Sequence, residues 1–127
     1  MLSEDMSITE RIEKERRVHL ANEFIRTIAG CGRQFFHHQG VVAHISRDST
    51  GRIYIHDERT KKRIWIRAGC VWHGFNNGGT LQRLIELLAE YIKTGKQLPS
   101  AMGQHWGYGE DMPKVIAAGQ ELGVIEQ

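Results

Sequence analysis

The residue types in this chain that most readily do chemistry are cysteines and histidines. Cys70 and His73 have the Cys-x-x-His spacing of half a zinc site, and Cys31 with His37 or His38 could supply the remaining ligands. The second half has no matching Cys-x-x-Cys or His-x-x-x-His spacing, so cysteines buried as small apolar side chains are the favoured interpretation. We therefore predict no bound metal and no cofactor, with a zinc-stabilised protein as an alternative.

Catalysis is the second possibility for the same residues. Cys70 could form a dyad with His73 or His105, but the sequence positions no third group beside them. The segment 74–80, GFNNGGT, could hold an anion at the start of a helix, yet no Lys-Ser or Lys-Thr pair follows as in a P-loop. The sequence thus predicts a protein that is not an enzyme, and a small enzyme remains an alternative.

Aromatic and basic residues alternate with isoleucines in RIYIHD, residues 52–57, and RIWIR, residues 63–67. Successive side chains of a strand point to opposite faces, so the isoleucines share one face and the aromatic and basic residues share the other. The second face could bind a protein partner, bind single-stranded nucleic acid, or simply support the sheet. We predict the partner- or nucleic-acid-binding residues to be Arg52, Tyr54, His56, Arg63, Trp65 and Arg67, with His44 as a possible addition.

A further aromatic segment, QHWGYG at residues 104–109, lies between glycines in a stretch without regular periodicity. It could serve as a binding loop, or it could fold back as a lid that buries Trp106. The sequence leaves both possibilities open.

Helical periodicity appears in three segments of the chain. A helix over 8–29 is introduced by Ser7 and Glu10, which form a capping-box pattern, and its first half is charged enough to lie on the surface. A second helix is predicted over 81–94 with Thr80 as its N-cap, and a short third one over 112–122 with Asp111 as its cap.

Strand patterns fill the middle of the chain, over 41–47, 52–57 and 63–67, with a further strand possible at 34–38. Short polar turns make neighbouring strands antiparallel, and the isoleucine face needs a cover that the two long helices supply. The predicted fold is α+β, an antiparallel three- to four-stranded meander with two long helices on one face and a short C-terminal helix. Residues 1–127 are predicted to form a single domain, with 1–7 disordered.

Composition narrows the class of protein further. The chain has 127 residues, of which 40% are hydrophobic and 25% charged, and it has no apolar run of the roughly 18 residues that a membrane span needs. Two cysteines are too few for a disulfide framework, which favours a reduced, cytoplasmic location. The net charge of +2 conceals a basic middle, because residues 47–67 hold seven Lys and Arg against three Asp and Glu.

The segments ANEFIRTIAGCGRQFF, GRIYIHDERTKKRIWI and WHGFNNGGTLQRLIELLAEYIKTGK resemble short accessory proteins of bacteriophages and prophages. The resemblance implies a stoichiometric binder that acts in the host cytoplasm on a bacterial protein or nucleoprotein complex. An anti-CRISPR protein, which inhibits host defence, is one example of such a binder. A direct single-stranded nucleic-acid-binding protein is the alternative, and a homodimer formed through the aromatic face is also open. No membrane partner is expected.

Overall fold

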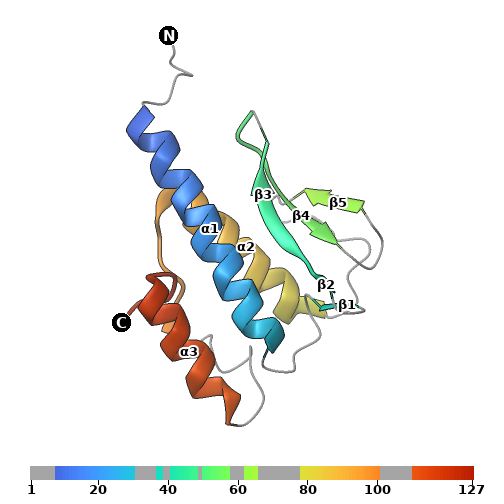
Figure 1. The fold of residues 1–127 in the computed structure, drawn as a ribbon, viewed down its shortest axis with the longest axis vertical. Coiled ribbons are helices and arrows are strands. Elements are labelled where there is room, and N and C mark those ends of the chain that lie inside the picture. Colours follow the sequence, from blue (N-terminus) through green and yellow to red (C-terminus); the bar gives the residue numbers. More distant parts are fainter. Residues whose placement is uncertain are drawn as a thin grey trace.

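The computed structural model describes residues 8–30, 37–38, 41–48, 50–57, 62–65, 78–100 and 110–127. In chain order the elements are α1 (Ile8–Gly30), β1 (His37–His38), β2 (Val41–Val42), β3 (His44–Arg47), β4 (Ile53–Asp57), β5 (Lys62–Trp65), α2 (Gly78–Thr94) and α3 (Asp111–Leu122) (Figure 1). The α+β class is confirmed.

The strands divide into two antiparallel sheets. β1 pairs with β2, and β3, β4 and β5 form a three-stranded sheet in that order. The predicted single meander of three to four strands is not confirmed in that form, because the predicted strand 41–47 is interrupted at Ala43. The side chain of Ala43 is 5% exposed and belongs to the core.

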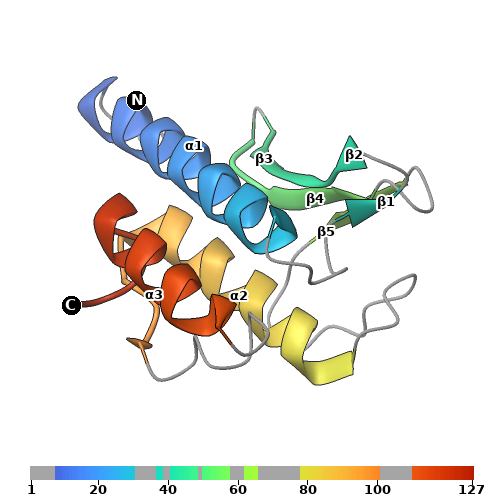
Figure 2. The same ribbon diagram turned by 60° about the horizontal axis from the view of Figure 1, so that its bottom comes forward.

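Helix α1 is the central element of the packing. It contacts α2, α3 and β3, and the helices lie on one side of the β3–β4–β5 sheet (Figure 2). The core contains Ala21, Phe24, Ile25 and Ile28 from α1 together with inward side chains of the sheet and of α2. Burying each large aliphatic side chain contributes roughly 1.5–3 kcal/mol, so this core is the main source of stability.

The first half of α1 extends past this core. Ile8 is 77% exposed and Ile12 is 63% exposed, although both continue the apolar spacing of the second half. The expectation that the charged first half lies at the surface is therefore confirmed.

The C-terminal ends of α2 and α3 coincide with glycines, whereas their N-terminal ends differ from the predicted caps. Gly95 (φ 82°) and Gly123 (φ 81°) adopt the left-handed conformation directly after α2 and α3. Two predicted N-caps are wrong: α2 begins at Gly78, which places Thr80 inside its first turn, and Asp111 is already helical, with Glu110 preceding it. The predicted capping residue Ser7 lies outside the described residues.

Candidate binding face of the sheet

The turn between β3 and β4 is built around one carboxylate. Oδ1 of Asp48 accepts hydrogen bonds from the backbone N–H of Thr50 (2.9 Å), the Thr50 hydroxyl (2.7 Å) and the backbone N–H of Arg52 (2.9 Å). These bonds, that from the Thr50 hydroxyl above all, hold the pKa of Asp48 below its usual range. Gly51 completes the turn with φ 89°, so Arg52 is fixed at the start of β4.

The register of the three strands produces two rows on the outward face. One row runs His44–His56–Arg63, and the other runs Ser46–Tyr54–Trp65. The inward positions pair Ile45 with Ile55 and Ile55 with Ile64, which confirms the predicted alignment of isoleucines.

The first row contains a direct ring contact. The imidazoles of His44 and His56 stack with centroids 5.3 Å apart and an interplanar angle of 19°. His44 is exposed and His56 half-buried, so the pair forms a flat ring surface that solvent can reach.

Two contacts tie β3 to α1. The side chain of Asn22 bonds to the backbone of Ile45, with Oδ1 2.7 Å from the nitrogen and Nδ2 2.9 Å from the oxygen. At the end of the strand, Nη1 of Arg47 donates to Oε2 of Glu15 over 3.0 Å, with only 9% of the Arg47 side chain exposed. The edge strand of the sheet is thereby tied to the helix.

The structure describes five of the six residues that we predict to bind a partner or nucleic acid. Arg52 is exposed beside the face, Tyr54 and His56 are half-buried on it, and Arg63 and Trp65 occupy outward register positions in β5. Arg67 lies outside the described residues. Ser46 was missed by sequence reasoning, although its alternation with Ile45 in the 41–47 segment would have identified it.

A second polar cluster went unrecognised in the sequence. Glu13, Arg16 and Arg17 on α1 surround a cavity beside Tyr91 of α2. Their spacing of three and four residues marks a helical ion-pair cluster, but nothing local indicates that α2 lies against it.

The candidate metal ligands are placed only in part. His37 and His38 form β1, whereas Cys31, Cys70 and His73 lie outside the described residues, as do the aromatic residues 104–109. Among the residues that are described, no group of three or more His, Cys, Asp or Glu could hold a metal ion. The described helices also include none that is long and apolar enough to cross a membrane.

The fold and the outward face of the β3–β4–β5 sheet together define a small α+β protein with aromatic and basic residues at the outward sheet positions. The family model of YoqU matches residues 10–127, and the chain belongs to the YoqU family. The name is of the type given to Bacillus phage and prophage proteins, which supports the resemblance to phage proteins at that level. No curated protein and no solved structure matches the chain.

Proposed function

We propose that this protein is a small non-enzymatic binding protein whose outward sheet face docks on a bacterial protein or nucleoprotein complex and occludes it. One observation carries the proposal: the register brings imidazole, guanidinium, phenol and indole positions into two adjacent rows across three strands. Tyr, Trp and Arg are the residues that most often anchor protein interfaces.

Charge indicates the chemistry of the partner surface. The six outward positions of β3, β4 and β5 contain no carboxylate, while Arg63 is among them and Arg52 lies beside them. The stretch 47–67 that contains β4 and β5 holds seven Lys and Arg against three Asp and Glu. An acidic patch on a protein, or the phosphate backbone of the nucleic acid in a nucleoprotein complex, is complementary to such a face.

The phage-type family name supports the biological form of this function. If the chain acts as a phage protein within a bacterial host, its targets are host proteins and nucleoproteins. Inhibition of a host-defence complex, of which anti-CRISPR activity is one kind, is the specific form that we propose.

Direct binding of single-stranded nucleic acid is the second candidate. The stacked imidazoles of His44 and His56 favour it, because bases stack on flat rings and nearby arginines contact phosphates. Its affinity for a labelled oligonucleotide would fall steeply with added salt, since each phosphate contact releases counterions. A weak and salt-independent signal would eliminate this candidate.

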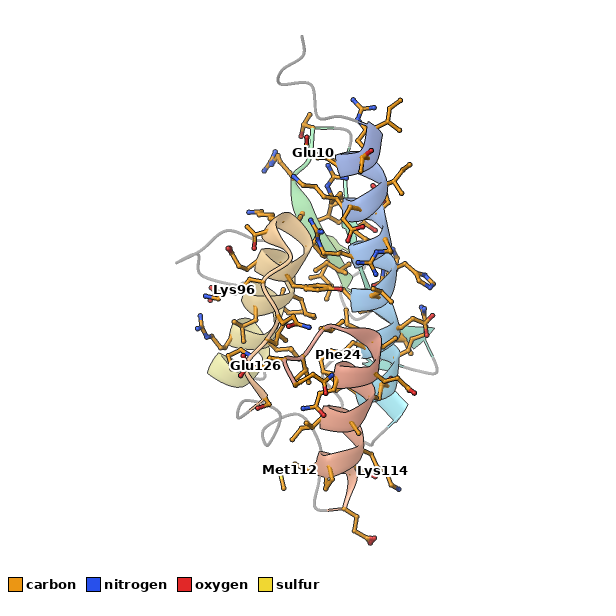
Figure 3. All side chains as sticks on the ribbon, turned by 90° about the vertical axis from the view of Figure 1, so that its left-hand side faces the viewer. Glu10, Phe24, Lys96, Met112, Lys114 and Glu126 are labelled. Atoms are coloured by element: carbon orange, nitrogen blue, oxygen red, sulfur yellow. The ribbon has the colours of Figure 1, made fainter. Side chains whose placement is uncertain are left out.

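The decisive experiment compares three tagged proteins as baits in a bacterial lysate, with mass spectrometry of the bound proteins. The face variant carries Arg52→Glu and Tyr54→Ala. The control carries Lys114→Glu, which reverses a cation that is 73% exposed on α3, away from the sheet (Figure 3).

The proposal expects a partner that wild type and the Lys114→Glu control retain and that the face variant loses. Loss of one interface anchor costs about 2 kcal/mol or more, which is at least a tenfold weaker affinity. A partner retained equally by all three proteins would overturn the proposal. Light scattering on the same samples tests whether the face instead joins two copies of the chain.

A further inference from the structure

A polar cavity of about 320 Å³ lies between α1 and the C-terminal ends of α2 and α3. Its lining includes Glu13, Arg16, Arg17, Tyr91 and Gln97. The volume is at the lower end of the range for small-molecule sites, so the cavity suits a small ligand. It lies on different elements from the sheet face, and its role is independent of the function proposed above.

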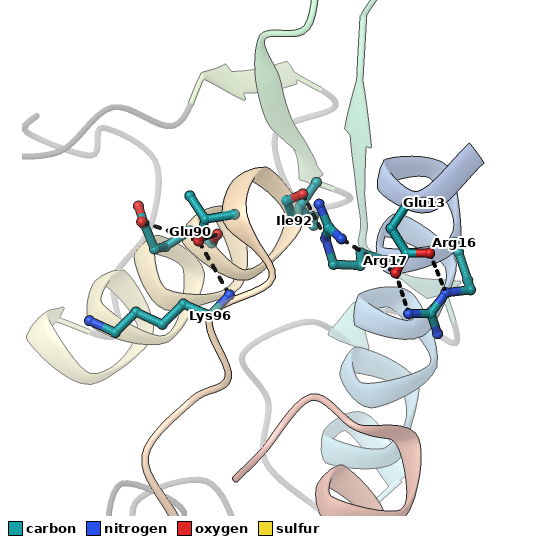
Figure 4. Close-up of polar contacts among 7 residues, drawn as sticks. Glu13, Arg16, Arg17, Glu90, Ile92 and Lys96 are labelled. Carbon is teal, nitrogen blue, oxygen red and sulfur yellow. Dashed lines mark hydrogen bonds and ion pairs between the residues drawn. The ribbon is translucent and has the colours of Figure 1, made fainter. Parts of the chain in front are cut away.

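Arg17 is the residue that fixes the geometry of this cavity. Its Nε donates to the backbone oxygen of Ile92 over 3.0 Å, and only 12% of its side chain is exposed (Figure 4). The bond satisfies a carbonyl in the last turn of α2, where a cation is favoured by the helix dipole. The guanidinium is therefore held in place before any ligand arrives.

The two arginines have more donors than the cluster has acceptors. Glu13 accepts from Nη1 of Arg17 (3.4 Å) and from Nε (3.2 Å) and Nη2 of Arg16. Within the described part of the chain, Nη2 of Arg17 and Nη1 of Arg16 have no acceptor. Two guanidinium charges face a single carboxylate, although the C-terminal ends of α2 and α3 add partial negative charge.

Tyr91 contributes a buried hydroxyl to the same place. The residue is 3% exposed, and among the described residues its hydroxyl has no hydrogen-bond partner. Burial raises the pKa of Tyr91, while the nearby charges of Arg16 and Arg17 oppose the rise. The phenol thus stays protonated at neutral pH and can donate, and a buried donor left without an acceptor costs roughly 1–3 kcal/mol.

We propose that this cavity binds a small oxyanion, a phosphate or carboxylate group, through the free guanidinium N–H groups of Arg16 and Arg17 and the hydroxyl of Tyr91. An oxyanion supplies the acceptors that these donors lack, and charge-assisted hydrogen bonds are the strong ones. Arg16, with 55% of its side chain exposed, lies on the solvent side, and Arg17 lies at the inner end.

Calorimetric titration with sodium phosphate, and separately with sodium acetate, tests this at constant ionic strength with chloride as the balancing anion. Saturable single-site binding is expected. In NMR spectra, changes in amide chemical shift should be confined to residues 13–17, 91–97 and 122–123. Binding of phosphate alone assigns a phosphate group, binding of acetate alone assigns a carboxylate, and binding of neither overturns the proposal.

Two variants and one matched control locate the site. Tyr91→Phe and Arg16→Gln should each weaken binding at least about tenfold, because each removes a hydrogen bond to a charged ligand. Arg26→Gln should leave it unchanged, because Arg26 pairs with Glu23 as Arg16 does with Glu13, is 50% exposed, and does not line the cavity.

Equal weakening by Arg16→Gln and Arg26→Gln would show a nonspecific charge effect and overturn the proposal, as would unaltered binding by Tyr91→Phe. Within the described residues, Arg16 donates only to Glu13, and its side chain is largely exposed, so Arg16→Gln keeps the test valid if Tyr91→Phe fails to fold.

Discussion

Asn22 on α1 binds both the backbone nitrogen (2.7 Å) and the backbone oxygen (2.9 Å) of Ile45 on β3. β3 is an edge strand of its sheet, so the outward N–H and C=O of Ile45 have no strand beside them. The amide of Asn22 presents one acceptor and one donor, as a neighbouring strand would. It therefore closes an edge that could otherwise pair with another chain.

Replacing Asn22 with Ala should lower the free energy of unfolding by about 2–3 kcal/mol. Both backbone groups of Ile45 would lose their partner in a part-buried position, and each unsatisfied group costs about 1–3 kcal/mol at full burial. Urea denaturation measures the change. Glu23→Gln, on the neighbouring position of the same helix, serves as the control, and a loss below about 0.5 kcal/mol for Asn22→Ala would contradict the edge-closing role.

Gly119 should be intolerant of even one added carbon. A Cβ there would lie 2.5 Å from Cδ1 of Ile125 and 2.9 Å from Cε1 of Phe24, and both of those side chains are fully buried. Figure 3 shows Phe24 between α1 and α3. After allowance for the better helix propensity of alanine, we expect Gly119→Ala to cost about 1–2 kcal/mol.

Gly30→Ala is the matched control for this substitution. Gly30 also lies within a helix, but a Cβ there would meet nothing within 4 Å. Thermal unfolding should show Gly30→Ala as stable as wild type or slightly more so. A Gly119→Ala protein that melts at or above the temperature of the Gly30→Ala protein would argue against close packing at α3.

Two isoleucines of α1 should differ sharply in their contribution to stability. Ile25 is fully buried, so Ile25→Ala is expected to cost about 2–5 kcal/mol through lost burial and a cavity. Ile12 is 63% exposed, and Ile12→Ala should change stability by less than about 0.5 kcal/mol. If chemical denaturation gave similar losses of unfolding free energy for the two variants, the first half of α1 would be packed against other parts of the protein.

Asp48 should make stability depend on acid pH. Its pKa is lower in the folded state than in the unfolded chain, so it stabilises the fold above the unfolded value of about 3.9, and this contribution is lost as the pH falls through the folded value. Asp48→Asn should be less stable than wild type at neutral pH, and the difference should shrink in acid. Urea midpoints of both proteins, measured from neutral pH down to about pH 3, test this pH dependence. A stability difference that stays constant over this range would rule out the Asp48 carboxylate as the source of the difference.

Local patterns in the sequence were sufficient to predict most of the elements. The helix predicted over 8–29 is observed at Ile8–Gly30, and the alternation of RIYIHD and RIWIR correctly places isoleucines opposite one another in Ile55 and Ile64. These features depend on residues a few positions apart, where periodicity and turn residues determine the conformation. The outward aromatic and basic positions follow from the same alternation.

Contacts between distant residues decided the rest. Arg17 meets Ile92 across 75 positions and Asn22 meets Ile45 across 23, and no local pattern encodes either contact. The polar cavity beside Tyr91, the closed edge of β3 and the exposure of Ile8 and Ile12 all depend on where the helices lie relative to one another. The sequence determined which faces were apolar, but only tertiary packing decided which of them would be covered, because burial depends on the whole set of elements that compete for one core.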